Sequence, residues 1–493
     1  MKSATFFARL LGIAVVCLVS SPSAFALQSD SLTRGAVIER VVCRAAADQS
    51  YALFLPASYT PQKAWPIIYC FDPAARGRVP VERFKAAAEK YGVIVAGSNN
   101  SRNGATDVAA AVRAMMNDTG ERLAIDPRRV YTAGFSGGGR VATGVALSLG
   151  NAVAGVIACG GGFPASVAPT KSVTFALFAT AGSEDFNYPE MRGLTRTFER
   201  LGLANRFATF EGGHEWLPAA LAEEAIAWLE LQAMKNNRRA RDEAFINERF
   251  EQSLSRARTA ESAGKSYEAY IHFSDAASDF KGLRDVAELE RHTNELKDAK
   301  EVKQAVKQED EAEREQQTRV KELYRLKASL RSQDERQELA ADRLNDYGEQ
   351  PPKNDDERRQ ALADLQKNLA ALKKKSDAPP GSFDRTVARR VINQFFAYLS
   401  ESAYILQQRK QYAAAAENLS LAALVAPDNP RLLYNLACAH ALNRDRRNAL
   451  EALRRAVAKG FKDAAAIESD KDLESLRDDP AYKQLVEELK KKS

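Results

Sequence analysis

Short apolar runs alternate with amphipathic stretches between about residues 37 and 231, and glycines and prolines stand at the joins. This alternation predicts an α/β domain. The runs Ile67-Ile68-Tyr69 and Val93-Ile94-Val95 are continuously apolar, as in strands of a parallel sheet covered on both faces. The predicted strands are Tyr51–Leu55, Pro66–Phe71, Val93–Gly97, Arg129–Ala133, Gly155–Ala158, Val173–Thr180 and Arg206–Phe210. Segments between them, such as Val81–Tyr91 and Asp107–Thr119, have helical spacing.

The pattern becomes helical throughout after about residue 235, where glycine is scarce and Ala, Glu, Lys, Arg, Gln and Leu dominate. Residues 286–346 are so charged that they predict an exposed long helix or a coiled coil. Pro351-Pro352 and Pro379-Pro380-Gly381 interrupt the helices and indicate linkers. We therefore expect an α/β domain over residues 27–235, a charged helical region over 236–385 and helical repeats over 386–493.

A repeat is visible near the C-terminus. Ala403, Ala415, Ala422 and Pro427 are followed, all at the same interval along the chain, by Ala437, Ala449, Ala456 and Phe461. The interval and these positions resemble the tetratricopeptide pattern over about residues 391–463, in which small residues let two antiparallel helices approach closely. Ala257, Ala269 and Ala276 have the same internal spacing, so residues 250–283 are a further candidate unit. Such repeats imply a protein or peptide partner.

The first 26 residues have the order of a signal peptide. Lys2 and Arg9 precede an apolar run over residues 10–19, and Ala24-Phe25-Ala26 offers a small-x-small cleavage site. The run is shorter than the ~20 residues of a spanning helix. We expect a mature chain from Leu27, periplasmic or secreted and without a membrane span. Cys43, Cys70, Cys159 and Cys438 would then lie where disulfides are permitted, and their spacing does not say which of them pair.

Composition excludes two broad classes. Seventy-one Lys and Arg face 65 Asp and Glu, and without Lys2 and Arg9 the balance is 69 − 65 = +4, interleaved along the chain. That is no nucleic-acid signature. Five cysteines without a Cys-x-x-Cys pair, and four histidines, argue against a structural zinc site. We expect neither a metal nor a cofactor.

The strongest chemical motif is Gly134-Phe135-Ser136-Gly137-Gly138, between the predicted strand Arg129–Ala133 and a helix. A Gly-x-Ser-x-Gly sequence in that context predicts a nucleophile elbow. The sharp turn leaves no room for side chains at Gly134 and Gly138. It lifts the Ser136 hydroxyl above the sheet, and the amide of Gly137 faces a developing oxyanion.

A base and a carboxylate follow in the order that the elbow requires. His214 is the one histidine between residues 27 and 231, and it lies in the loop after the last predicted strand. Histidine can accept and return the serine proton near neutral pH. Asp185, after the penultimate strand, is the first choice for the carboxylate that orients the imidazole, with Glu184 in reserve. The predicted triad is Ser136, Asp185 and His214.

With these residues the chain resembles the α/β-hydrolase superfamily, and within it the esterases related to polyhydroxybutyrate depolymerases and feruloyl esterases. The resemblance covers about Ala52 to Leu229. It rests on Ile125-Asp126-Pro127-x-x-Val130-Tyr131, on Gly134–Gly138, on Gly182-x-x-Asp185 and on Gly212-Gly213-His214. It implies an α/β-hydrolase fold and a serine-dependent acyl-enzyme mechanism, and it leaves the substrate open.

One departure from these esterases concerns the oxyanion hole. They usually have His-Gly where this chain has Asp72-Pro73-Ala74. Pro73 has no amide hydrogen, so Ala74 is the nearest candidate donor beside Gly137. The Asp72 carboxylate would disfavour an oxyanion unless Arg76, Arg78 or Arg140 neutralises it. Either Asp72 meets a polar or cationic group of the substrate, or the oxyanion hole is degraded.

The predicted cleft is open. Only about fourteen residues separate Ala158 from Val173, where related enzymes often insert a helical lid. An uncovered cleft suits bulky or polymeric esters. Trp216, with Tyr69 or Phe71, is a candidate apolar wall, although core packing is the commoner role of such residues.

Two functions compete. The first is an exported carboxylic ester hydrolase whose helical repeats recruit a partner or a polymeric substrate. The second is an inert hydrolase fold that serves as a periplasmic scaffold and binds proteins through its repeats. A peptidase ranks third, because the same triad cleaves amides. The complete set of triad residues favours the esterase.

Overall fold

The computed structural model describes residues 32–330 and 355–492, so the predicted signal peptide and Leu27 lie outside the described residues. The chain forms two compact units, of which the first ends at Asp310 and the second begins at Glu311. In the described ranges no helix is both long and apolar enough to cross a membrane. The cysteines in these ranges, Cys43, Cys70, Cys159 and Cys438, are buried and unpaired.

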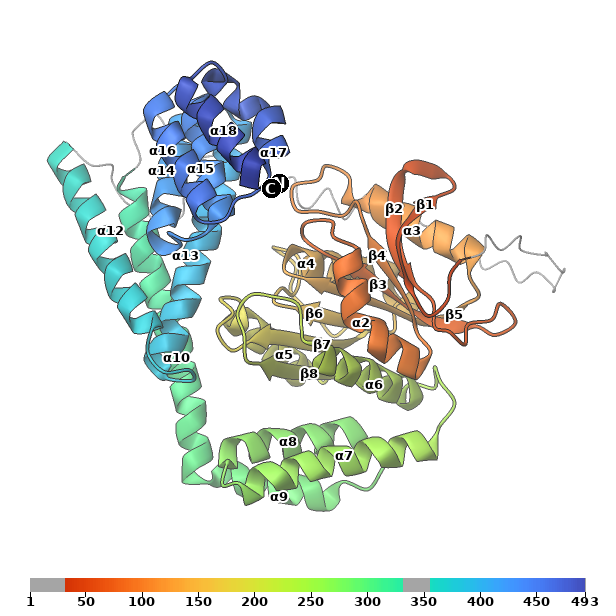
Figure 1. Ribbon diagram of the computed structural model, residues 1–493. Coiled ribbons are helices and arrows are strands. Elements are labelled where there is room, and N and C mark those ends of the chain that lie inside the picture. Colours follow the sequence, from red (N-terminus) through yellow and green to blue (C-terminus); the bar gives the residue numbers. More distant parts are fainter. Residues whose placement is uncertain (1–31, 331–354, 493) are drawn as a thin grey trace. The chain divides into compact units, whose positions relative to one another are not determined.

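The first unit contains a sheet of eight strands in the order β1-β2-β4-β3-β5-β6-β7-β8 (Figure 1). The strands are β1 Val37–Cys43, β2 Ala46–Phe54, β3 Trp65–Phe71, β4 Ile94–Ser98, β5 Ile125–Phe135, β6 Gly155–Cys159, β7 Ala176–Gly182 and β8 Asn205–Phe210. From β4 to β8 neighbouring strands are parallel, as predicted, whereas β2 pairs antiparallel with both β1 and β4. Strand β1 was not predicted, because exposed Glu39 and Arg40 interrupt its apolar run.

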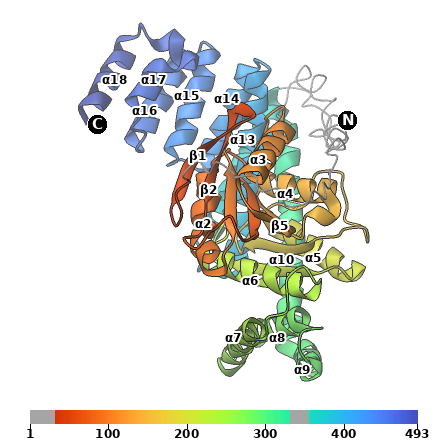
Figure 2. The ribbon, with the colours of Figure 1, turned by 90° about the vertical axis from the view of Figure 1, so that its right-hand side faces the viewer.

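Helices cover both faces of this sheet (Figure 1 and Figure 2). They are α2 Arg78–Tyr91, α3 Val108–Arg122, α4 Gly137–Leu149, α5 Tyr188–Leu201 and α6 Ala219–Lys235. Side chains of α3, α4 and α5 pack in one core and those of α2 and α6 in another. Successive residues of a strand point to opposite faces, so Tyr69 joins the first core and Cys70 the second.

The first unit also contains α7 Glu243–Ser262, α8 Ser266–Phe280, α9 Ala287–Asp298 and the beginning of α10 Lys300–Ala328. The candidate unit 250–283 covers most of the α7–α8 hairpin, and Ala257, Ala269 and Ala276 are buried there. The charged stretch 286–346 is not one continuous helix. Ala299, with φ −59° and ψ 142°, separates α9 from α10 Lys300–Ala328, and residues 331–346 lie outside the described ranges.

The second unit is helical. After α10 it contains α12 Asp355–Ser376, α13 Phe383–Gln408, α14 Tyr412–Val425, α15 Pro430–Leu442, α16 Arg446–Ala458, α17 Ala464–Ser469, the 3₁₀ turn η4 Lys471–Leu476 and α18 Pro480–Lys492. Consecutive helices from α12 to α16 pack against each other. The repeated alanines, Ala403, Ala415, Ala422, Ala437, Ala449 and Ala456, are at most 1% exposed. Small side chains therefore lie where these helices meet.

Candidate active site

Ser136 stands at a sharp turn between β5 and α4. Its φ of 52° and ψ of −121° are rare for a residue with a side chain, and its N–H donates to the carbonyl of Cys159 at the end of β6 (2.8 Å). Backbone strain of this kind costs about 1–3 kcal/mol and persists where the surroundings enforce it, commonly at functional sites. The strand, the strained serine and the following helix form a nucleophile elbow.

The glycines of the elbow are required by close contacts between backbones. An alanine at position 134 would place its Cβ 2.0 Å from the carbonyl oxygen of Gly138. An alanine at position 138 would place its Cβ 1.9 Å from the carbonyl oxygen of Phe71, at the end of β3. Both distances are far below van der Waals contact, so the turn closes only without these side chains.

Asp185 and His214 are far apart in sequence but are bonded to each other. His214 Nδ1 lies 2.9 Å from Asp185 Oδ1, and the Asp185 side chain is fully buried. The N–H of Asn187 donates to the same carboxylate oxygen (2.8 Å), which fixes the carboxylate. Asp185, and not the reserve candidate Glu184, is thus the partner of His214. A proton held on Nδ1 leaves Nε2 as the basic nitrogen.

Two aromatic rings hold the His214 imidazole. The ring centroids of Phe135 and Phe186 lie 4.6 Å and 4.2 Å from that of His214. Each ring belongs to a residue adjacent in sequence to a triad member, Phe135 to Ser136 and Phe186 to Asp185. Phe186 was not among the predicted site residues, although its place directly after the predicted carboxylate was a usable signal.

The imidazole and the elbow both border the loop after β6. A Cβ on Gly161 would lie 2.9 Å from Ser136 Cα, and a Cβ on the preceding Gly160 would lie 3.1 Å from His214 Nδ1. In the part of the chain that the structure describes, no hydrogen bond joins the Ser136 hydroxyl to His214. Such bonds are often long in a free enzyme and shorten when substrate binds. The loop therefore brings the predicted triad to one edge of the sheet.

Asp72, directly after β3, is buried, and both of its carboxylate oxygens accept hydrogen bonds. Arg76 donates to both carboxylate oxygens (2.9 Å each), Trp216 Nε1 donates to Oδ2 (2.9 Å) and the Ala74 N–H donates to Oδ1 (2.9 Å). Burial acts to raise the pKa of Asp72, but the donors from Arg76, Trp216 and Ala74 together outweigh it and lower the pKa. Of the three arginines considered for neutralising this charge, Arg76 does so.

These contacts correct four sequence predictions. Trp216 is 4% exposed and packs on Phe84 and Phe135, and Tyr69 is 2% exposed with its hydroxyl on Thr119. Neither side chain lines an open cleft, which contradicts their assignment as substrate-binding residues. Asp72 has no exposed surface to offer a substrate. The Ala74 amide, predicted as an oxyanion donor, already donates to Asp72.

Asp72→Asn is expected to destabilise the first unit by about 2–3 kcal/mol, because it removes a charged acceptor that holds three donors. Since the folded-state pKa is lowered, the carboxylate stabilises the fold above its unfolded-state pKa, and this stabilisation is lost as pH falls through the folded-state pKa. The deficit should therefore be largest at neutral pH and shrink in acid. Urea unfolding followed by tryptophan fluorescence measures it, because all three tryptophans (65, 216 and 228) lie in this unit.

The matched control for this prediction is Asp48→Asn, at an exposed carboxylate of β2. Exposed substitutions usually change the free energy of unfolding by no more than about 0.5 kcal/mol. Equal stability of Asp72→Asn and Asp48→Asn at neutral pH would contradict the role assigned to the Asp72 cluster.

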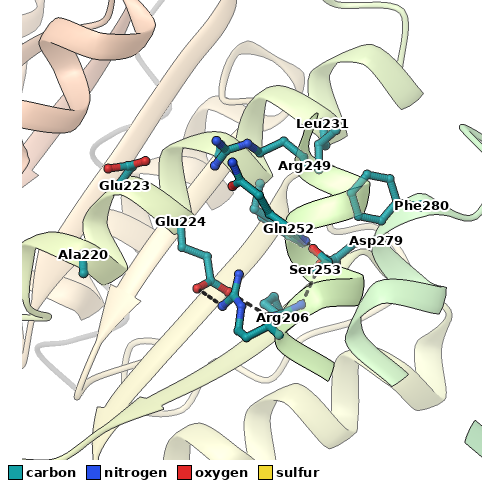
Figure 3. A pocket seen from close by; sticks show the side chains of 13 residues that line it. Arg206, Ala220, Glu223, Glu224, Leu231, Arg249, Gln252, Ser253, Asp279 and Phe280 are labelled. Atoms are coloured by element: carbon teal, nitrogen blue, oxygen red, sulfur yellow. Dashed lines mark hydrogen bonds and ion pairs between the residues drawn. The ribbon is translucent and has the colours of Figure 1, made fainter. Parts of the chain in front are cut away.

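A cavity of about 310 Å³ in the same unit lies away from the triad, between α6 and the α7–α8 hairpin (Figure 3). Oppositely charged side chains that line this cavity form ion pairs with each other. Arg206 pairs with Glu224 (2.8 Å) and Asp279 (2.6 Å), and Arg256 pairs with Glu224 (2.6 Å). Trp228 Nε1 also donates to Asp279 (2.6 Å). This cluster joins β8 and α6 to α7 and α8, so we assign it to structure.

One group of potential metal ligands occurs within residues 32–330 and 355–492. The ligand atoms of Cys438, Asp470 and Asp472, in the second unit, lie within 4.8 Å of one another. Burial, reinforced by both carboxylates, holds the pKa of the Cys438 thiol well above its usual range. Tyr434 donates to Asp470 (2.6 Å), so this carboxylate already has a partner.

Comparisons with known proteins found solved structures that are similar at low sequence identity. No protein family model matches the chain, and no curated protein matches it. Similar solved structures include a ferulic acid esterase (17% identity, TM-score 0.34, 39% of this chain and 97% of that one) and the Staphylococcus aureus fluorophosphonate-binding serine hydrolase F (15%, 0.33, 40% and 99%). Thermogutta terrifontis esterase 2 is a third (13%, 0.32, 41% and 96%). The strand order, the antiparallel β2 and the elbow between β5 and α4 give the first unit an α/β-hydrolase fold.

Proposed function

We propose that the protein is an exported serine hydrolase that cleaves carboxylic esters through an acyl-enzyme intermediate. The observation that carries this proposal is the bond between His214 Nδ1 and a fully buried Asp185, beside a serine held in a strained elbow. A buried carboxylate on an imidazole fixes one tautomer and stabilises the imidazolium that forms during acyl transfer.

The proposed mechanism assigns one role to each triad residue. The Ser136 hydroxyl attacks the ester carbonyl while His214 Nε2 takes its proton, and Asp185 keeps the imidazole oriented. The N–H of Gly137 donates to the negatively charged oxygen of the tetrahedral intermediate. The alcohol leaves with the proton from His214. A water molecule then loses a proton to His214 and attacks the acyl group, which releases the acid and restores Ser136.

An open site supports bulky esters as substrates. Residues 160–175, which connect β6 to β7, contain no helix, so no helical lid is inserted at this point. The buried side chains of Tyr69, Asp72 and Trp216 take no part in this proposed substrate site. We propose in addition that the repeats of the second unit bind a protein or a polymeric substrate, and that residues 1–26 direct export and are then removed.

Labelling with a fluorophosphonate probe tests the proposal directly. A fluorophosphonate reacts with a serine that has an active base, and we expect one adduct on the wild-type protein and none on Ser136→Ala. Ser148→Ala, further along α4, is the matched control and should label like the wild type. Absence of an adduct on folded wild-type protein would overturn the proposal.

The alternative function is a scaffold whose hydrolase domain is inert. The buried alanines of the repeat favour it, because packed helical hairpins of this kind can hold a peptide. A p-nitrophenyl ester series, from short to long acyl groups and including an aromatic one, separates the two functions. Turnover that depends on Ser136 supports the esterase, whereas no turnover by folded protein supports the scaffold. A p-nitroanilide in the same series tests the peptidase.

A further inference from the structure

Neither of the two residues that follow Asp72 gives the oxyanion hole of the proposed esterase a second backbone donor. In the described part of the chain, the N–H of Gly137 has no acceptor and is available at the start of α4. Pro73 has no N–H, and the N–H of Ala74 donates to Asp72. Acyl transfer usually needs two or more donors directed at the developing charge. Another group must therefore replace the missing amide.

Asn103 contacts both the loop after β3 and the start of α4. It belongs to the loop that follows β4, and its N–H donates to the carbonyl of Pro73 (2.8 Å). The neighbouring Arg102 pairs with Ala74 as an isolated β-bridge. The Asn103 backbone is thus fixed to the loop after β3, where a hydrolase would have its second donor.

The carboxamide of Asn103 lies against the first residue of α4. A Cβ on Gly137 would be 1.9 Å from Asn103 Oδ1, 2.7 Å from Cγ and 2.9 Å from Nδ2. The amide group therefore occupies the space that a side chain at position 137 would fill. This contact gives a reason for a third glycine in the elbow, beside Gly134 and Gly138.

The side chain of Asn103 is not committed to the fold, unlike those of nearby asparagines. Asn100 Oδ1 accepts the N–H of Ser50 (2.8 Å), and Asn99 Nδ2 donates to the carbonyl of Glu39 (3.1 Å). Among the residues that the structure describes, none forms a hydrogen bond with the carboxamide of Asn103, which is an exposed residue. A half turn about χ2 exchanges its oxygen and its NH₂ group, so either end can face the site.

We propose that Asn103 Nδ2 is the second oxyanion donor of this hydrolase, acting together with the N–H of Gly137. This inference rests on the proposed function. The Nδ2–H group donates to the oxygen that becomes negatively charged when Ser136 attacks, and no bond to Asn103 forms or breaks. A neutral side-chain amide suits this role because it adds no charge beside the bonded Asp72 and Arg76.

The test compares Asn103→Ala and Asn103→Asp with wild-type protein on p-nitrophenyl esters. Losing one oxyanion donor lowers kcat by about 100- to 1,000-fold. We expect Asn103→Ala to show that loss with KM changed less than threefold. Asn103→Asp keeps the shape of the side chain but offers only acceptors and a negative charge, so it should be at least as slow. Arg102→Ala, at the neighbouring exposed residue, is the matched control and should keep wild-type kcat.

A trifluoromethyl ketone, which forms a tetrahedral adduct with an active serine, provides a second readout. Its inhibition constant should rise by the same factor as kcat/KM falls across the variants. A residue that only shapes the loop would leave Asn103→Asp close to wild type, and kcat within threefold in both variants would overturn the inference while the esterase stands. Wild-type protein that neither hydrolyses esters nor reacts with a fluorophosphonate would overturn the proposed function and this inference with it.

Discussion

Alanine at Ser136 or at His214 is expected to lower kcat for p-nitrophenyl ester hydrolysis by about a million-fold, and the double variant should be no slower than either single one. The nucleophile and the base act as one unit, since a serine without a base and a base without a serine both leave only binding and oxyanion stabilisation. Purified variants assayed near neutral pH with a high enzyme concentration measure the remaining rate.

Matched controls for these variants lie in the same unit. Ser148→Ala on α4 and His272→Ala on α8 replace the same residue types outside the proposed site, and both should keep kcat within threefold. Additive losses in the double variant, or a His214→Ala rate within tenfold of wild type, would contradict a shared mechanism. The imidazole would then be a packing group between Phe135 and Phe186.

The sheet and the order of the proposed triad could be predicted because each depends on local sequence. Apolar runs mark the central parallel strands, and Ser136, Asp185 and His214 each follow a predicted strand, beside glycines that permit a tight loop. The bond between Asp185 and His214 is long-range, but both residues come to the same edge of the sheet because parallel strands end there. The parallel topology of the sheet therefore allowed three residues, each found from its local sequence, to be predicted as one site.

The surroundings of the site were harder to predict because they depend on side-chain direction. The alternation of side chains along β3 predicts that Tyr69 and Cys70 point to opposite faces of the sheet. The hydrogen bond between the Tyr69 and Thr119 hydroxyls depends in addition on how the helices pack. Trp216 was a candidate for an apolar wall of the cleft, and instead its indole N–H donates a hydrogen bond to Asp72. The sequence Asp72-Pro73-Ala74 did contain one usable signal, since an aspartate often accepts the N–H of the second residue after it. In that turn the N–H of Ala74 is not available to an oxyanion, and Asn103 is the alternative donor that we propose.

Asp185→Ala is expected to lower kcat by about 10,000-fold, a loss smaller than that at Ser136 or His214. The carboxylate does not react; it holds the imidazole tautomer and stabilises its charged form. Removing it leaves His214 between Phe135 and Phe186 with no acceptor for the Nδ1 proton. Steady-state kinetics with the same esters measure the loss, and ¹⁵N NMR of the imidazole reports which nitrogen carries the proton.

Asp185→Asn should be less damaging than Asp185→Ala, for a reason particular to this site. Asp185 Oδ1 accepts from both Asn187 N–H and His214 Nδ1, whereas the buried Oδ2 has no hydrogen-bond partner in the described residues. An asparagine with its NH₂ group toward His214 would set that group against the N–H of Asn187, so the amide oxygen should take the place of Oδ1. The imidazole then keeps its tautomer and loses only the neighbouring charge, and kcat should exceed that of Asp185→Ala by about tenfold or more.

If the two variants are equally slow while NMR still finds the proton on Nδ1, charge rather than tautomer dominates the role of Asp185. A proton found on Nε2 in Asp185→Asn would instead contradict the control that we assign to Asn187.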